Sequence, residues 1–316
     1  MSEKITKKIS VIIPIHNRLN ITKEGLKCLH DSLEIYNREG AGSCDYKVIV
    51  VDDGSTDGSS EWISENYPDT NIVKGDGNLW WSGAINRGAQ FAINKLNSDW
   101  ILLWNDDAVP AKNYFLQLEQ VLLTPNIADT IIGSKILYKN NPTKIWSVGG
   151  YFNRFTGSYG MYNEVKQTDR FMQCDWLAGM GTLVPVALIK KYNIWWDEKR
   201  FPQYHGDSDY ILRCKRLGVT IVTCLDLVLY NNTETTGLTT KRNLREAIKG
   251  ATSIRSNFNF RKYLMFYSDH GLFPIAYTGL FKKYFYYFGG FIKHSIINRN
   301  HLSSNSFDKQ SDYSNK

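Results

Sequence analysis

The segment VVDDGSTDGS carries an informative pair of acidic side chains, because Asp52 and Asp53 come at the end of an apolar run. A carboxylate in this position accepts a hydrogen bond from a pyrimidine N3–H group or from a ribose hydroxyl. The small residues that follow let the backbone turn while its N–H groups face a ligand. The same residue types favour helix caps, so a helix-capping turn is an equally strong interpretation of this segment taken alone.

A second acidic pair, Asp106 and Asp107, lies in WNDDAVP after the apolar run WILLW. Neighbouring carboxylates repel each other unless a cation or hydrogen bonds neutralise them. Their hard oxygen atoms suit Mg²⁺ or Mn²⁺, and such ions typically share their coordination shell with diphosphate oxygens. The segment therefore predicts a divalent-cation site, with a solvated acidic turn as the alternative.

A third acidic segment, HGDSDY, precedes the amphipathic run YILRCKRLG and contains Asp207 and Asp209. A carboxylate beside a hydroxyl group can act as a general base and remove its proton. Asp207 also stands where a helix begins, so its alternative role is that of a helix N-cap.

These segments must be positioned by the elements around them, and strands alternate with helices through residue 125. Strands are predicted at 9–15, 47–52, 71–73 and 100–104, and helices at 20–37, 59–66, 83–96 and 112–123. Such alternation predicts the α/β class with an open, doubly wound, mostly parallel sheet. Ligands bind at the carboxyl ends of the strands in these sheets. The polar segments PIHNR, DDGSTDGS and NDDA all fall at strand ends of this kind.

The second half of the chain has a less regular pattern. Residues 130–175 read as short strands punctuated by glycines, followed by helices at 185–192 and 208–217 and a strand at 219–230. From about residue 240 the composition changes to basic and aromatic helices. The polar stretch 302–316 is predicted to be disordered.

The ordered motifs resemble glycosyltransferase family 2, whose members have the GT-A fold. They are ISVIIPIHNR, VVDDGSTDGS, GDGNLWWSGAINRG, WNDDAVP, WLAGMGTLVPVALIKKY, WWDEKRF and HGDSDYILRCKRLG. Each motif alone is a weak signal, but the set in this order is highly specific and covers roughly residues 9–237. The chain looks most similar to the rhamnosyltransferase-like branch that builds bacterial cell-surface polysaccharides.

The resemblance implies an inverting transfer of a sugar from a nucleotide-sugar donor to a hydroxyl group. The donor would be a dTDP-rhamnose-like or UDP-linked sugar, and the acceptor a glycan or a lipid-linked molecule. It also implies a catalytic domain over 1–240, divided into a nucleotide-binding half (about 1–125) and an acceptor half (about 126–240). A basic, aromatic helical extension (241–301) and the tail (302–316) would follow.

The resemblance assigns roles to individual residues. Donor binding falls to Pro14, His16, Asn17, Asp52, Asp53, Gly77, Asn78, Trp81, Gly83, Asn86, Asn105 and Asp106. The pocket for the donor sugar and the acceptor falls to Trp176, Gly179, Gly181 and Asp209. Asp207 matches the catalytic base, and Asp107, with Asp106, matches the ligands of Mg²⁺ or Mn²⁺.

Three positions depart from the family's pattern. Asn105 stands at the first position of the DXD-type motif, and Gly206 stands where an acid usually precedes the base. Many relatives carry a metal-binding histidine after the last strand, where this chain offers Asn231 and Asn232. The resemblance therefore assigns no third protein ligand to the metal.

Composition restricts the class of protein. Hydrophobic residues make up 42% and charged residues 22%, which is ordinary for a globular protein and excludes a fully disordered chain. The five cysteines are scattered and form no CxxC pair, so they indicate neither a zinc site nor a disulfide framework. The N-terminal segment has no apolar signal region, and we expect a cytoplasmic protein.

The aromatic, basic segment 261–299 has two interpretations of equal weight. Lys282, Lys283 and Pro274 interrupt its apolar run, and a membrane-spanning helix needs about 20 mostly apolar residues. It could lie at the inner face of the cell membrane as an interfacial segment, because lysines and aromatic rings suit anionic lipid. It could equally form packed helices with an oligomer interface, which leaves the oligomeric state open.

Two rival functions fit the sequence less well. A sugar-phosphate nucleotidyltransferase would need a Gly-rich, basic loop after the first strand, and PIHNR lacks one. A non-catalytic carbohydrate-binding or nucleic-acid-binding module would leave the acidic strand ends unexplained, despite the net charge of +7. We therefore predict no nucleic-acid partner. A dinucleotide-dependent dehydrogenase is disfavoured because no GxGxxG follows the first strand.

Overall fold

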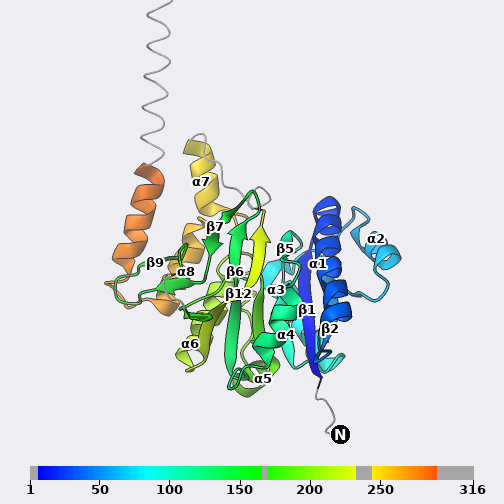
Figure 1. The fold of residues 1–316 in the computed structure, drawn as a ribbon. Coiled ribbons are helices and arrows are strands. Elements are labelled where there is room, and N and C mark those ends of the chain that lie inside the picture. Colours follow the sequence, from blue (N-terminus) through cyan, green and yellow to red (C-terminus); the bar gives the residue numbers. More distant parts are fainter. Residues whose placement is uncertain (1–5, 166–168, 233–243, 290–316) are drawn as a thin grey trace, which may run out of the picture. The chain divides into compact units, whose positions relative to one another are not determined.

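The computed structural model of the chain describes residues 6–165, 169–232 and 244–289 (Figure 1). By its internal contacts the chain divides into two compact units. The larger unit comprises residues 1–152 and 159–236, and the smaller unit comprises residues 153–158 and 237–316. The predicted boundary at residue 240 and the predicted tail at 302–316 lie outside the described residues.

A ten-stranded sheet forms the centre of the larger unit within the described ranges. Its order is β10-β12-β6-β11-β4-β1-β2-β3, with β5 paired to β12 and β7 paired to β6. The strands are β1 (Lys7–Ile15), β2 (Cys44–Asp52), β3 (Asn71–Lys74), β4 (Trp100–Leu103), β5 (Ala108–Pro110), β6 (Thr130–Tyr138), β7 (Asn141–Ser147), β10 (Phe171–Gln173), β11 (Thr182–Pro185) and β12 (Thr220–Asn231). A separate hairpin joins β8 (Gly150–Phe152) to β9 (Tyr159–Met161).

The first four strands run parallel, as the alternating sequence pattern predicts. Beyond β4 the sheet becomes mixed, because β11 runs antiparallel to both of its neighbours, β4 and β6. β12 is again parallel to β6. The predicted α/β class with an open sheet is confirmed.

Helices pack on the sheet of the larger unit. They are α1 (Leu19–Glu39), α2 (Ser59–Asn66), α3 (Trp80–Asn94), α4 (Tyr114–Leu122), α5 (Val186–Tyr192) and α6 (Gly206–Arg216). α1 contacts α4 and β5, whereas α3 contacts β1, β2 and α6 (Figure 1). Each βα unit therefore delivers the end of a strand and the start of a helix to the same edge of the sheet.

β1 is buried on both faces, which explains its unbroken apolar run. Val11 and Ile13 belong to the same core cluster as Leu26 and Leu29 of α1, because alternate side chains of a strand point to one face. Ile12 points to the other face, towards α3. A Cβ atom on Gly88 would lie only 2.5 Å from Ile12 Cγ2, so α3 approaches the sheet closely at a glycine.

Two predicted helix starts need correction. α3 begins at Trp80 rather than at residue 83, and Trp80 itself has a positive φ of 55°. α6 begins at Gly206, and its N-cap residue is His205, with a φ of 66°. Asp207 therefore lies in the first turn of α6, and the alternative that made it the N-cap is wrong.

The smaller unit is helical where the structure describes it. It contains α7 (Leu244–Thr252), α8 (Phe260–His270) and helical residues 277–289. Tyrosine hydroxyls tie its parts together: Tyr267 donates to Gly157 O at 2.6 Å, and Tyr284 donates to Phe258 O at 2.6 Å. Among the helices in the described ranges, none is both long enough and apolar enough to traverse a bilayer.

Candidate active site

The polar strand ends of β1 and β2 lie side by side at one edge of the sheet. In the parallel ladder Ile15 is the partner of Asp52, so the segments that follow both strands emerge together. His16 Nδ1 lies 2.6 Å from Asp53 O, and the backbone N–H of Asn17 donates to Ser55 Oγ at 2.9 Å. These contacts join the PIHNR and DDGSTDGS segments into one surface.

Asp52 is completely buried, and its carboxylate holds this surface from beneath. It accepts hydrogen bonds from the backbone N–H of Ser55 at 2.8 Å, from Ser60 Oγ, and from Lys74 Nζ at 3.1 Å. Burial by itself raises the pKa of Asp52, but these hydrogen bonds outweigh it and leave the pKa below its usual value. The side chain is therefore an ionised anchor.

Asp53 fixes the loop that enters α3. Its Oδ1 accepts from the backbone N–H of Gly77 at 2.8 Å, and its Oδ2 accepts from that of Trp80 at 3.0 Å. The approach requires glycine: Gly77 has a φ of 88°, and a Cβ on Gly54 would lie 3.0 Å from Gly77 N. Asn78, in the same loop, is exposed. Pro14 lies near the end of β1 and is half-buried.

Arg18 neutralises the second acidic pair. Its guanidinium lies 3.2 Å from Asp106 Oδ1 and 3.1 Å from Asp107 Oδ2. Asp106 is 4% exposed and also accepts from Thr22 Oγ1 at 3.3 Å. Burial raises the pKa of Asp106 to about 7, Arg18 opposes that rise, and the charge of Asp107 adds to it.

Arg18 was absent from the residues that the sequence singled out. A signal was available, since it is the one cationic side chain in PIHNR and two adjacent carboxylates need a cation. The contact itself spans about ninety residues of sequence and depends on the path of α1. A Cβ on Gly25 of α1 would lie 1.9 Å from Asp106 O, so this helix passes directly against the acidic segment.

The donor set at this place fits a hard divalent cation. The carboxylates of Asp106 and Asp107 converge on one positive group, which is the charge that such an ion would supply. The backbone ladder pairs Asn231 of β12 with Ala108, directly after Asp107. Asn231 is buried, and this pairing brings its backbone next to the segment that carries the two carboxylates.

Trp81 links the acidic pair to the region of Asp207. Its indole Nε1–H donates to Asn105 Oδ1 at 3.3 Å. The same ring covers Gly179, where a Cβ would lie 2.3 Å from Trp81 Cζ2. The backbone N–H of Gly179 in turn donates to Asp207 Oδ2 at 2.9 Å. Four of the residues predicted from the sequence thus form one continuous connection.

Asp207 is held rigidly in a half-buried position. Besides Gly179 N–H, it accepts from the backbone N–H of Ser208 at 2.7 Å. Burial raises the pKa of Asp207, although both backbone hydrogen bonds oppose the rise. A carboxylate of raised pKa accepts a proton more readily, which suits a general base.

The neighbours of Asp207 explain one departure from the family pattern. A Cβ on Gly206 would lie 2.1 Å from Ser82 Oγ, so α3 leaves no space for an acidic side chain there. Asp209 is buried and accepts from Arg213 Nε at 2.8 Å, one turn later in α6. Its geometry is consistent with support of the helix.

Two further predicted residues, Asn86 and Gly181, contact neighbouring segments of the protein. The side-chain amide of Asn86 hydrogen-bonds to residues 196–198: its Nδ2 donates to Trp196 O and to Glu198 Oε2, both at 2.8 Å. Gly181 has a φ of 67°, and a Cβ there would lie 2.3 Å from Leu229 Cδ1. These contacts position the segments around the site, and the predicted ligand contacts of Asn86 and Gly181 stay predictions.

An aromatic wall stands beside Asp207. Trp176 is stacked on Tyr159 with ring centroids 5.1 Å apart, and Tyr159 Oη donates to Ser208 Oγ at 3.4 Å. Trp176 Nε1 donates to Tyr151 O at 3.3 Å. Tyr151 and Tyr159 were missed in the sequence, because nothing in it shows that β8 and β9 pair next to α6.

Comparison with known proteins identifies the family of this chain. Residues 10–181, more than half of the chain, match the sequence profile of Glycosyl transferase family 2. No curated protein sequence gave a match.

Similar solved structures share the fold. The mannosyltransferase PcManGT from Pyrobaculum calidifontis, in complex with GDP-Man and Mn²⁺, is 15% identical with a TM-score of 0.53, covering 89% of this chain and 70% of that one. GalNAc-T7 with UDP, GalNAc and Mn²⁺ is 14% identical with a TM-score of 0.55, covering 73% of this chain and 44% of that one. S. aureus TarS is 15% identical with a TM-score of 0.50, covering 81% of this chain and 43% of that one. These likenesses establish the GT-A fold.

Proposed function

Because this chain belongs to Glycosyl transferase family 2 and is therefore a glycosyltransferase, we propose that it transfers a sugar from a nucleotide-sugar donor to a hydroxyl group with inversion. The donor in this proposal is a dTDP-rhamnose-like or UDP-linked sugar. The acceptor is a hydroxyl of a glycan or a lipid-linked molecule, in the synthesis of cell-surface polysaccharide. The reaction takes place on the cytoplasmic side of the cell membrane.

One observation carries the proposal: the connection from Asn105 through Trp81 and Gly179 to Asp207. It sets a candidate base at a fixed place relative to the acidic pair at Asp106 and Asp107. A displacement at an anomeric carbon needs two separate positions in the site. One holds the departing diphosphate, and the other holds the attacking hydroxyl group.

The nucleotide end is assigned to the surface held by Asp52 and Asp53. His16 and Asn17 lie exposed on it, where they can contact the nucleoside. Asp52 acts on the base through the loop that it anchors, because its own oxygens already accept from Ser55, Ser60 and Lys74. The Gly77–Trp81 loop, fixed by Asp53, closes the side towards the sugar.

The neighbouring cation site is assigned to Asp106 and Asp107, with Asn231 as the third ligand. A bound Mg²⁺ or Mn²⁺ would offset the negative charge that develops on the departing nucleoside diphosphate. Arg18 pairs with both carboxylates in the absence of such a cation, and the ion would take over this pairing.

Asp207 performs the proton transfer in this mechanism. Its carboxylate takes the proton of the acceptor hydroxyl while that oxygen bonds to the anomeric carbon, and the bond from this carbon to the diphosphate oxygen breaks. The hydroxyl attacks from the face opposite the leaving group, so the configuration inverts. Gly179 and Ser208 N–H groups orient the carboxylate. Tyr159, which is half-buried and stacked on the buried Trp176, offers an aromatic face for the acceptor sugar.

The experiment is the substitution Asp207→Asn, which keeps the shape of the side chain and removes its basicity. We expect the rate of transfer to fall by about 100- to 10,000-fold. Binding of the nucleoside diphosphate, measured by calorimetry with Mn²⁺, should be unchanged. Asp31→Asn is the matched control, because Asp31 is an exposed acid on α1 that pairs with Lys27 at 2.6 Å. Turnover of Asp207→Asn at the rate of the control would refute the assignment.

A further inference from the structure

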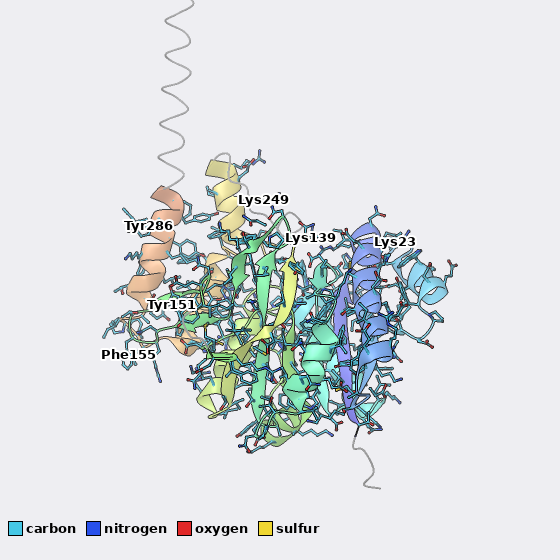
Figure 2. All side chains as sticks on the ribbon, viewed as in Figure 1. Lys23, Lys139, Tyr151, Phe155, Lys249 and Tyr286 are labelled. Atoms are coloured by element: carbon cyan, nitrogen blue, oxygen red, sulfur yellow. The ribbon has the colours of Figure 1, made fainter. Side chains whose placement is uncertain are left out.

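The helix of residues 277–289 in the smaller unit carries large apolar side chains on its outer face. Phe281, Phe285 and Tyr286 are 65%, 75% and 64% exposed. Tyr286 projects outward from this helix, drawn in orange in Figure 2. The opposite face is buried through Leu280 and Tyr287. The helix is therefore anchored on one side and presents its aromatic side outward.

The loop before the helix extends this outer face. Phe273 is 76% exposed, and its ring contacts that of Tyr277 with centroids 5.4 Å apart. Tyr277, Phe281 and Phe285 follow at intervals of four residues, which places them in one row along a helix. The strongly exposed apolar side chains of the loop and the helix are those of Phe273, Ile275, Phe281, Phe285 and Tyr286. Because four of the five are aromatic, we call this set the aromatic ridge. A group of large exposed apolar side chains of this kind indicates a binding surface.

Charge is concentrated in the same unit. Residues 153–158 and 237–316 hold 14 of the 38 lysines and arginines but only 4 of the 31 aspartates and glutamates. The smaller unit thus has a net charge of +10, and the rest of the chain has a net charge of −3. No acidic residue occurs in 271–289, and Lys282 is exposed on the outer face of the helix between Phe281 and Phe285.

We propose that the smaller unit docks on the surface of an anionic lipid bilayer, with the aromatic ridge inserted among the lipid headgroups. Phenylalanine and tyrosine rings favour the boundary between headgroups and acyl chains, and Lys282 and its basic neighbours favour acidic headgroups. A second copy of the chain is a less favourable partner for the ridge, because two smaller units, each with a net charge of +10, would repel each other. The proposal is independent of the transfer reaction proposed above.

The test uses the full chain with vesicles of phosphatidylcholine, with and without phosphatidylglycerol. We expect co-sedimentation with the anionic vesicles only. The double substitution Phe281→Ser and Phe285→Ser should lower the partition constant by about tenfold or more. The control is Leu123→Ser with Leu217→Ser, which removes two apolar side chains that are 55% and 44% exposed on the larger unit. Circular dichroism and thermal unfolding establish that each variant is folded.

Two outcomes would overturn the proposal. One is equal partition of the ridge variant and the control. The other is a concentration-dependent dimer, seen by light scattering, that the ridge variant loses, because the ridge would then be an interface between copies. Binding of a nucleoside diphosphate by the ridge variant, measured in the same preparation, separates failure here from failure of the proposed reaction.

Discussion

Arg18 forms ion pairs with both members of the acidic pair, Asp106 and Asp107, and these contacts fix the position of its guanidinium. The guanidinium reaches both carboxylates from the first turn after β1, within 3.2 Å of Asp106 and 3.1 Å of Asp107. It therefore occupies the electrostatic role that a divalent cation would take. In the cation site proposed above, the ion would compete with Arg18, so we expect this residue to lower the affinity for the ion.

We expect Arg18→Met to destabilise the protein in the absence of divalent ions. Loss of the Arg18 guanidinium should lower the free energy of unfolding by about 1–3 kcal/mol, because the carboxylates of Asp106 and Asp107 lose their positive partner. The stabilisation on adding Mn²⁺ should become larger, since the ion no longer displaces a guanidinium. Thermal unfolding with and without Mn²⁺ measures both effects.

Lys27→Met is the control for Arg18→Met, because its exposed pair with Asp31 should contribute less than about 1 kcal/mol. Equal destabilisation of the two variants, with equal shifts by Mn²⁺, would contradict this role of Arg18.

Asp106 gives the site a pH dependence. Burial raises its pKa to about 7, above the ordinary value of 3.8. The folded protein therefore retains a proton that the unfolded chain has lost, and this residue's contribution to stability falls as pH rises between these values. A divalent ion needs the ionised carboxylate, so affinity for Mn²⁺ should decrease by about tenfold per pH unit below 7.

Calorimetry in buffers of different ionisation enthalpy tests the pH dependence. It should record release of a proton on Mn²⁺ binding near pH 7 and little release one unit or more above it. An affinity that does not change across this range would show that Asp106 is already ionised or does not bind the ion.

At the scale of elements, glycines set the distances between the helices and the site. Gly25 brings α1 against the Asp106 backbone, Gly88 brings α3 against β1, and Gly206 brings α6 against Ser82 of α3. In each case a Cβ would lie within 2.5 Å of another residue. The helices hold the acidic segment and Asp207 in place because no side chain separates them.

Gly25→Ala should damage both stability and the site. Its Cβ would lie 1.9 Å from the Asp106 carbonyl oxygen, and a backbone atom cannot move aside as a side chain can. We expect the free energy of unfolding to fall by about 1–3 kcal/mol, with weaker Mn²⁺ binding. Denaturant unfolding and calorimetry measure the two effects.

Gly289→Ala is the matched control, since Gly289 lies in a helix and, among the described residues, its Cβ would meet nothing within 4 Å. Alanine favours a helix over glycine, so that variant should lose no stability. If Gly25→Ala were as stable as Gly289→Ala, α1 would not be fixed against Asp106.

At the scale of the whole molecule, two units of opposite net charge share one chain. The larger unit contains the acidic segments of the candidate site, and the smaller unit carries the excess of lysine and arginine. Salt should therefore weaken the vesicle binding proposed above, because screening reduces the attraction of the basic unit to anionic lipid. It should affect binding of the nucleotide less, since Asp52 and Asp106 are buried.

The sequence by itself was sufficient for the family, the α/β class and most elements of the larger unit. The runs around Ile12 and Val50 predicted buried parallel strands because apolar side chains must line both faces of such a strand. Leu26, Leu29 and Leu33 predicted α1 because their spacing forms one face of a helix. These are local patterns, and local chemistry decides them.

Only the tertiary structure decided which residues the predicted site residues meet. Trp81 covers Gly179, Arg18 reaches Asp107, and Tyr159 stacks on Trp176, although each pair except the last is separated by about ninety residues or more. Asn86 proved to be committed to Trp196 and Glu198. No local pattern encodes such contacts, because they depend on how the sheet order and the helix packing bring distant segments together.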